Sequence, residues 1–140
     1  MIFISMLNNI PIKWNYKSRK IENWFQSEIF TYLRKRDYFC YHPADIWYGT
    51  KLLDSIIISP EGKVFFIEFK KVMWYTFNMS QFEPSQIDVL ELMLDRWVEV
   101  YIMVFSVKTN TYWVGTYQYL KANANELLWV KLFSPKEKSI

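Results

Sequence analysis

The stretch "FFIEFKK", residues 65–71, decides the fold, because it has the composition of a buried strand and yet carries charge. Four of its seven residues are large and apolar, which is typical of a strand covered on both faces. Glu68 and Lys70 interrupt this run, and a charged group in such a setting loses hydration unless a partner compensates it. The stretch therefore predicts a central strand whose charges have a partner or a chemical role.

The residues around this strand predict a β-hairpin. "LLDSIII" (52–58) and "KVFFIEFKK" (63–71) flank the turn sequence "SPEG". Pro60 suits the second position of a type I turn, and Gly62 suits the left-handed position that follows. Apolar side chains dominate both faces of the hairpin, and Leu53 is expected on the face opposite Glu68. The strand pair should therefore lie in the middle of a sheet.

The loop length predicts the register of the two strands. With a three-residue loop, Ser59 pairs with Lys63, and continuing the pairing places Asp54 opposite Glu68. Opposed residues share a face, and Lys70 lies two residues further along on that face. Two carboxylates this close in an apolar setting repel each other, so we expect a divalent cation between them. Mg²⁺ suits such a site because it combines a few carboxylate oxygens with waters and substrate phosphates, and Mn²⁺ should substitute for it.

Hydrophobic periodicity predicts an α/β protein around the hairpin. The expected elements are a helix at 21–36, an extended segment within 38–48, strands at 52–58 and 63–71, a helix at 84–97, and strands at 98–107 and 112–120. Ser18 suits the cap before the first helix, and Pro84 suits the first turn of the second. Glu28 departs from the pattern of the first helix, because it projects from the apolar stripe and not from the wet face.

Length and composition predict one domain. The chain has 140 residues, of which 51% are hydrophobic and 20% aromatic, so it can bury a core without disulfides. We expect a single domain over 1–140, with its core at about 18–120 and a loose tail at 134–140. Seven Trp, ten Tyr and eleven Phe are more than one small core readily hides, which favours a partner subunit or ligand on the surface.

Charge, cysteine content and hydropathy predict the compartment. The net charge of +3 permits an anionic partner without requiring one. Cys40, the single cysteine, fits a reducing compartment and is expected to be a small buried side chain. No stretch approaches the roughly 18 to 20 continuous apolar residues of a membrane span. We expect a cytoplasmic, intracellular protein without a membrane partner.

Asp54, followed after a hairpin by Glu68, Phe69 and Lys70, resembles the signature of the PD-(D/E)XK nuclease superfamily. The resemblance implies a restriction-endonuclease-like fold, whose core runs helix, three strands, helix, strand in a mixed central sheet. It also implies Mg²⁺-dependent hydrolysis of phosphodiester bonds in DNA. The aromatic loop and "PSQIDVL" that follow are similar to Holliday-junction resolvases of the RecU kind and to related phage or viral endonucleases. This likeness implies branched DNA as substrate and a homodimer.

The resemblance also implies roles for individual residues. Asp54 and Glu68 would bind the metal, with the backbone carbonyl of Phe69 as a further ligand. Lys70 would orient or deprotonate the attacking water. The tripeptide E-x-K recurs in the turn, at Glu61 and Lys63, so the conjunction of residues carries the likeness and the tripeptide alone does not.

Further residues complete the expected site. Many members of the superfamily add a glutamate from the first helix and a glutamine at the start of the second, and Glu28 and Gln86 stand in those places. Glu28 would complete the metal shell; alternatively it is a solvated helix residue. Gln86 would help to position the water; alternatively it caps the first turn of its helix. The residues expected to contact DNA phosphates are Lys71, Arg34, Lys35 and Arg36.

Several alternatives stay open at this level. Asp45 competes with Asp54 for the metal, since it follows Pro43 by two residues. The aromatics of "WYTFNMSQF" (74–82) could stack on exposed bases or pack at a dimer contact. The chain could also be an inactive protein of the nuclease fold that binds DNA or a protein, or a plain aromatic-rich assembly protein.

Overall fold

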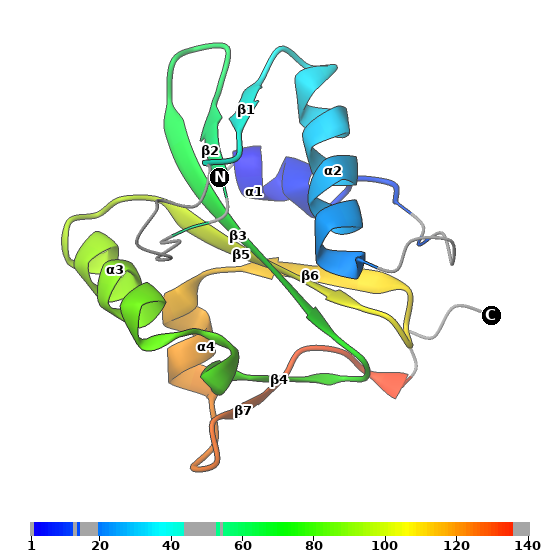
Figure 1. The fold of residues 1–140 in the computed structure, drawn as a ribbon, viewed down its shortest axis with the longest axis vertical. Helices are drawn as coiled ribbons and strands as arrows, with labels where there is room; N and C mark the ends of the chain where they lie inside the picture. The colour runs from blue at the N-terminus through cyan, green and yellow to red at the C-terminus, as the bar shows by residue number, and fades with distance from the viewer. Residues whose placement is uncertain (1, 13, 15–19, 44–52, 54, 136–140) are drawn as a thin grey trace.

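A computed structural model describes residues 2–12, 14, 20–43, 53 and 55–135 (Figure 1). The elements in chain order are α1 (Ile2–Leu7), α2 (Ile21–Arg34), β1 (Phe39–Tyr41), β2 (Ser55–Ile58), β3 (Val64–Val72), β4 (Thr76–Asn78), the 3₁₀ turn η1 (Met79–Gln81), α3 (Pro84–Asp95), β5 (Val100–Ser106), β6 (Thr111–Gly115), α4 (Tyr117–Asn123) and β7 (Trp129–Lys131). Asp54, Asp45 and the expected cap Ser18 lie outside the described residues. Among the described helices, none combines the length and the apolar character that crossing a membrane requires.

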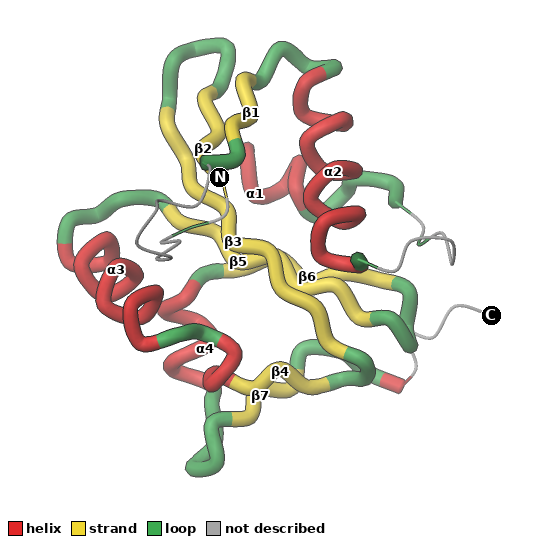
Figure 2. The backbone as a smooth tube through the Cα atoms, viewed as in Figure 1, coloured by secondary structure: helices red, strands yellow, loops and turns green. Residues whose placement is uncertain are grey.

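The main sheet has five strands in the order β1-β2-β3-β5-β6, and β4 and β7 form a separate two-stranded sheet (Figure 2). β3 pairs antiparallel with β2 and parallel with β5, whereas the β1–β2 and β5–β6 pairs are antiparallel. A parallel pair needs a crossover connection, and α3 lies in the segment that joins β3 to β5. The expected α/β architecture with a mixed central sheet and a central β3 is therefore confirmed.

The β2–β3 hairpin has the predicted turn and register. Ser59 donates its backbone N–H to the Lys63 carbonyl at 2.8 Å, and Gly62 adopts the left-handed conformation with φ of 89°. The ladder runs from the pair Ile58 and Val64 to the pair Ser55 and Ile67. This is the register that a three-residue loop dictates.

The expected alternation does not continue beyond the start of β2. Leu53 is buried with the cluster that includes Val72 and Phe77, on the face of Glu68, although alternation predicts the reverse face. The reason is that β2 begins at Ser55, so the two-residue period of a strand does not extend to Leu53. The opposition of Asp54 and Glu68 stays a prediction.

Both faces of the sheet are covered. Phe65, Ile67 and Phe69 belong to a core that also contains α1 and α2, in which the Phe25 and Phe69 rings meet edge to face at 5.5 Å. The other face packs against α3, α4 and the β4–β7 pair through Leu90 and neighbouring side chains (Figure 1). The sheet is thus the middle layer, and the β3 side chains from Phe65 to Phe69 are buried or half-buried on both faces.

The C-terminal half departs from the predicted strand at 112–120. β6 ends at Gly115, and Thr116 accepts a hydrogen bond from the Tyr119 N–H through Oγ1 at 3.1 Å, which caps α4. A threonine cap satisfies an exposed N–H of the first helical turn and so starts a helix where apolar residues alone suggest a strand. Two further features were not predicted, namely α1 and the pairing of β4 with β7. The helix expected at 21–36 is α2, and it ends at Arg34 and not at 36. β1 occupies only 39–41 of the expected extended segment.

Cys40 provides a test of the β1–β2 pairing. It is 4% exposed and pairs with Ile57, and burial raises the pKa of its thiol to about 11, although the Arg34 charge lowers it in part. Because the thiolate is the reactive form, Cys40 in the folded protein at about pH 8 should react with a disulfide reagent about a hundredfold more slowly than in the urea-unfolded chain. Absorbance of the released thiolate measures both rates. Equal rates would contradict the burial of β1.

Candidate functional site

Three of the predicted site side chains meet on one face of the sheet. Gln86 donates its amide N–H through Nε2 to Glu68 Oε2 at 2.9 Å. Lys70 Nζ lies 3.5 Å from the same carboxylate oxygen and 3.4 Å from Gln86 Oε1. One carboxylate oxygen therefore faces both an amide and an ammonium group.

Strand and helix geometry place these groups together. Glu68 and Lys70 share a face because they are two residues apart on β3. Gln86 lies in the first turn of α3, and its Oε1 also accepts the backbone N–H of Glu83 at 3.1 Å. This bond satisfies one of the free N–H groups at the start of the helix. Gln86 is therefore both the expected helix cap and a partner of the carboxylate.

Lys70 has two further partners that the sequence analysis did not identify. Its Nζ donates to the backbone carbonyl of Gln81 at 3.1 Å and lies 5.3 Å from the centre of the Phe82 ring. The first contact uses a backbone atom, so no residue type in the sequence signals it. Together with Glu68 and Gln86, these contacts hold the ammonium group in one place.

The cluster of Glu68, Lys70 and Gln86 is almost completely shielded from solvent. Glu68 is 2% exposed and Gln86 7%, and the Lys70 side chain is 11% exposed. A buried charge is costly unless it is paired and hydrogen-bonded, and these contacts supply both conditions. Even so, a buried ion pair is often no more stabilising than apolar residues of the same size. The buried ion pair is therefore not in itself a reason for the stability of the central strand.

The other predicted ligands lie differently. Glu28 is half-buried on α2, whose core contacts are on the face of Phe69 and not on that of Glu68. In the part of the chain that the structure describes, no hydrogen bond or ion pair joins Glu28 to the Glu68 cluster. The Phe69 side chain is fully buried between Phe25 and Phe30. The roles of Glu28 and of the Phe69 carbonyl stay predictions.

The predicted phosphate-binding cations fall into two groups. Arg34 donates to the Cys40 carbonyl at 2.9 Å, and the Arg36 guanidinium lies 3.5 Å from the centre of the Tyr32 ring, so both have partners within the fold. Lys35 is exposed at the end of α2. Lys71 is also exposed and lines a cleft at the end of β3. Of the four, Lys71 is adjacent to the cluster in the chain.

The described residues include one of the two carboxylates expected to bind a metal ion, Glu68. Within 2–12, 14, 20–43, 53 and 55–135 no three His, Cys, Asp or Glu side chains form a group that could hold an ion. Mg²⁺ can be held by one or two carboxylates together with waters and phosphates, and Glu68 is a carboxylate of that kind. Its expected mate Asp54 and the alternative Asp45 are outside the described residues. The fit to Mg²⁺ therefore rests on Glu68, and the second ligand stays a prediction.

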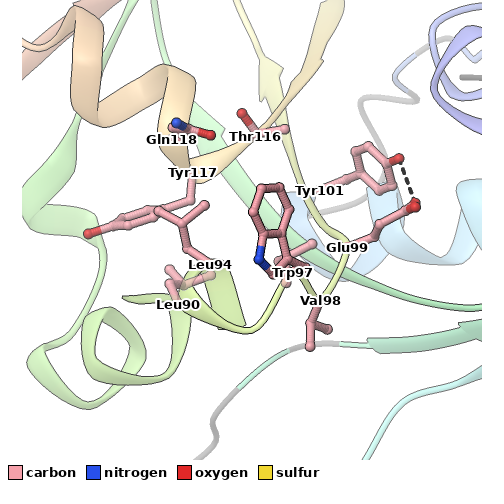
Figure 3. A pocket seen from close by; sticks show the side chains of 10 residues that line it. Leu90, Leu94, Trp97, Val98, Glu99, Tyr101, Thr116, Tyr117 and Gln118 are labelled. Atoms are coloured by element: carbon pink, nitrogen blue, oxygen red, sulfur yellow. Dashed lines mark hydrogen bonds between the residues drawn. The ribbon is translucent and has the colours of Figure 1, made fainter. Parts of the chain in front are cut away.

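A separate cavity of about 440 Å³ lies between α3, β5 and α4 (Figure 3). Its lining is mainly apolar and includes Trp97. The Tyr101 side chain points away from the cavity and packs with Phe3 and Phe65 on the other face of the sheet, where its hydroxyl donates to Glu99 at 3.0 Å. Burial and this carboxylate raise the pKa of Tyr101 to about 12, so the hydroxyl keeps its proton. The cavity is at the C-terminal end of α3, whereas Gln86 is in the first turn of that helix. It is therefore distinct from the charged cluster.

Comparisons of the chain with protein-family models, with curated proteins and with solved structures found no match. The resemblance to the PD-(D/E)XK nucleases consequently rests on the residues themselves. What the structure adds to that resemblance is the contact among Glu68, Lys70 and Gln86.

Replacing Gln86 tests the network. Gln86→Leu removes the amide donor to Glu68 and the acceptor for the Glu83 N–H, and leaving such buried groups without partners should lower the free energy of unfolding by about 1–3 kcal/mol. Urea unfolding measures the change. Gln118→Leu is the matched control, because Gln118 is exposed on α4, and its effect should stay within about 0.5 kcal/mol. Equal effects of the two substitutions would contradict the network.

Proposed function

We propose that the chain is a metal-dependent endonuclease that hydrolyses phosphodiester bonds in DNA, with branched DNA as its favoured substrate. The observation that carries the proposal is the buried contact of Glu68, Lys70 and Gln86. These are the acid, the lysine and the helical glutamine that the resemblance to PD-(D/E)XK nucleases implies. Their contact supports the proposal because residue spacing alone does not bring Gln86 to Glu68.

The proposed cofactor is Mg²⁺, with Mn²⁺ as a substitute. Glu68 would hold it together with Asp54, and the Phe69 carbonyl and Glu28 are the further ligands that the resemblance implies. When bound, such an ion polarises a phosphoryl oxygen and lowers the pKa of a water molecule. Glu68 is suited to this role because Gln86 fixes its carboxylate at 2.9 Å and leaves it little freedom to turn.

Lys70 is the proposed catalytic residue. Hydrolysis joins a water oxygen to phosphorus and breaks the bond between phosphorus and the leaving oxygen, which takes up a proton. Negative charge builds on the phosphate oxygens in the transition state. A fixed ammonium group stabilises that charge without having to reorganise, and Lys70 is fixed by Glu68 and by the Gln81 carbonyl. Gln86 acts as a positioning residue, since it contacts both members of the pair.

The proposed enzyme is a homodimer. Several large apolar side chains are exposed on the described surface, among them Leu127 at 75%, Phe39 at 57% and Leu128 at 50%. Apolar surface of this kind favours association with a second copy. The rival proposal is a protein of the same fold that binds DNA or a protein partner without cutting.

A cleavage assay separates these proposals. Linear, nicked and four-way-junction DNA are incubated with the wild type, Lys70→Ala and Glu68→Gln in the presence of Mg²⁺ or Mn²⁺. Both substitutions should reduce the rate of cutting by about a hundredfold or more, because they remove charge from the reacting centre. The four-way junction should be cut fastest by the wild type.

The chain provides its own matched control in the second E-x-K tripeptide. Glu61→Gln and Lys63→Ala alter exposed side chains in the hairpin turn, where Lys63 pairs with Glu99 on the surface, and should leave cutting unchanged. Wild-type binding to DNA without cutting in either metal would instead support the rival proposal. If the wild type neither binds DNA nor responds to the metal, the result would support a plain assembly protein.

A further inference from the structure

A cleft of about 390 Å³ opens where β3 leaves the sheet and turns into β4. Segments far apart in the sequence line it, because β7 lies alongside β4 and η1 follows directly (Figure 1). The lining residues are Glu22, Lys71, Val72, Met73, Trp74, Thr76, Gln81 and Trp129. The volume lies within the range of about 300–1,000 Å³ that is usual for ligand sites.

Two exposed indole side chains, those of Trp74 and Trp129, line the cleft. Trp74 is 54% exposed and Trp129 is 43% exposed, although an indole in a small protein is usually mostly covered. Their backbones are nevertheless fixed: the Trp74 carbonyl accepts the Ser106 hydroxyl, and the Trp129 N–H donates to Asn125 Oδ1 at 3.0 Å. Because an indole side chain has only two rotatable bonds, an exposed indole on a fixed backbone loses little conformational entropy when a ligand stacks on it.

Cations accompany the aromatic surface. Lys71 lines the cleft, and Lys108 Nζ lies 4.9 Å from the centre of the Trp74 ring. Glu22 is the acid of the lining, so an anionic chain should pass along the lysine side and avoid Glu22. Aromatic faces beside lysines are the combination that binds single-stranded nucleic acid, in which bases stack and phosphates pair with cations.

The cleft is joined to the candidate active site. Gln81 is part of its lining, and the Gln81 carbonyl accepts the hydrogen bond from Lys70 at 3.1 Å. Lys71 follows Lys70 directly in β3. Because neighbouring residues of a β-strand point to opposite faces, Lys71 does not share the face of Lys70, and a DNA strand in the cleft would approach the Glu68 cluster past Gln81.

We infer that this cleft binds unpaired bases of single-stranded DNA, with the indoles of Trp74 and Trp129 as stacking surfaces and Lys71 and Lys108 as phosphate partners. The inference deepens the proposed function and rests on it for the choice of DNA as the ligand. It names the part of the substrate that this surface recognises, namely an unpaired segment next to the bond that is cut.

Binding without cutting tests the inference. A fluorescein-labelled thymidine dodecamer is titrated with wild-type protein in EDTA at one fixed salt concentration, and fluorescence anisotropy reports the affinity. Trp74→Ala and Trp129→Ala should each weaken binding by about tenfold, because each removes a stacking surface. Trp74→Phe and Trp129→Phe retain a ring and should weaken it by less than the alanine variants.

Trp97→Ala is the matched control, since Trp97 is an exposed indole at the other cavity and should leave affinity within about twofold. The inference is overturned if the wild type does not bind the dodecamer, if Trp74→Ala and Trp129→Ala bind as well as the wild type, or if Trp97→Ala is equally impaired. A change of sedimentation coefficient in the Trp74 and Trp129 variants with unchanged affinity overturns it in favour of a protein interface.

The cleavage assay and the binding assay test the hydrolytic proposal and the cleft assignment separately. If the wild type cuts none of the DNA substrates but dodecamer binding depends on Trp74 and Trp129, the hydrolytic proposal is wrong and the cleft stands. If the wild type cuts DNA and binding is indifferent to both indoles, the cleft assignment is wrong and the hydrolytic proposal stands.

Discussion

The position of β3 in the middle of the sheet is the constraint on which the rest of the structure depends. It bonds to β2 on one side and to β5 on the other, and helices cover both faces. A side chain in the middle of this strand must therefore be apolar or fully partnered. Glu68 meets the second condition through Gln86 and Lys70, so the charged cluster is a consequence of where the strand lies as much as of which residues it carries.

The same connection builds the sheet and the candidate site. A parallel pair of β3 and β5 requires the chain to cross over, and α3 lies on that crossover. The first turn of α3 comes back against β3 and brings Gln86 to Glu68, while η1 just before it supplies the Gln81 carbonyl to Lys70. The topology that makes the sheet mixed therefore also completes the hydrogen bonds of the buried charges.

The buried network and the aromatic cleft adjoin each other at Gln81. Gln81 belongs to both, since its carbonyl fixes Lys70 and its side of η1 lines the cleft. The cluster is almost fully buried and hydrogen-bonded, whereas the cleft is open and lined by exposed indoles. The apolar cavity at the far end of α3 has an exposed indole, Trp97, but no lysine or arginine among its described lining residues.

Local chemistry in the sequence determined the hairpin, because Pro60 and Gly62 specify the turn and the turn specifies the register of β2 and β3. It also determined that Glu68 and Lys70 share a face, which follows from the two-residue period of a strand. Only the tertiary structure decided that the Gln86 side chain reaches Glu68, that Leu53 turns to the other face, and that β7 pairs with β4 and brings Trp129 beside the end of β3. These outcomes depend on contacts between segments distant in the chain, and neither periodicity nor turn preference encodes which distant segments will meet.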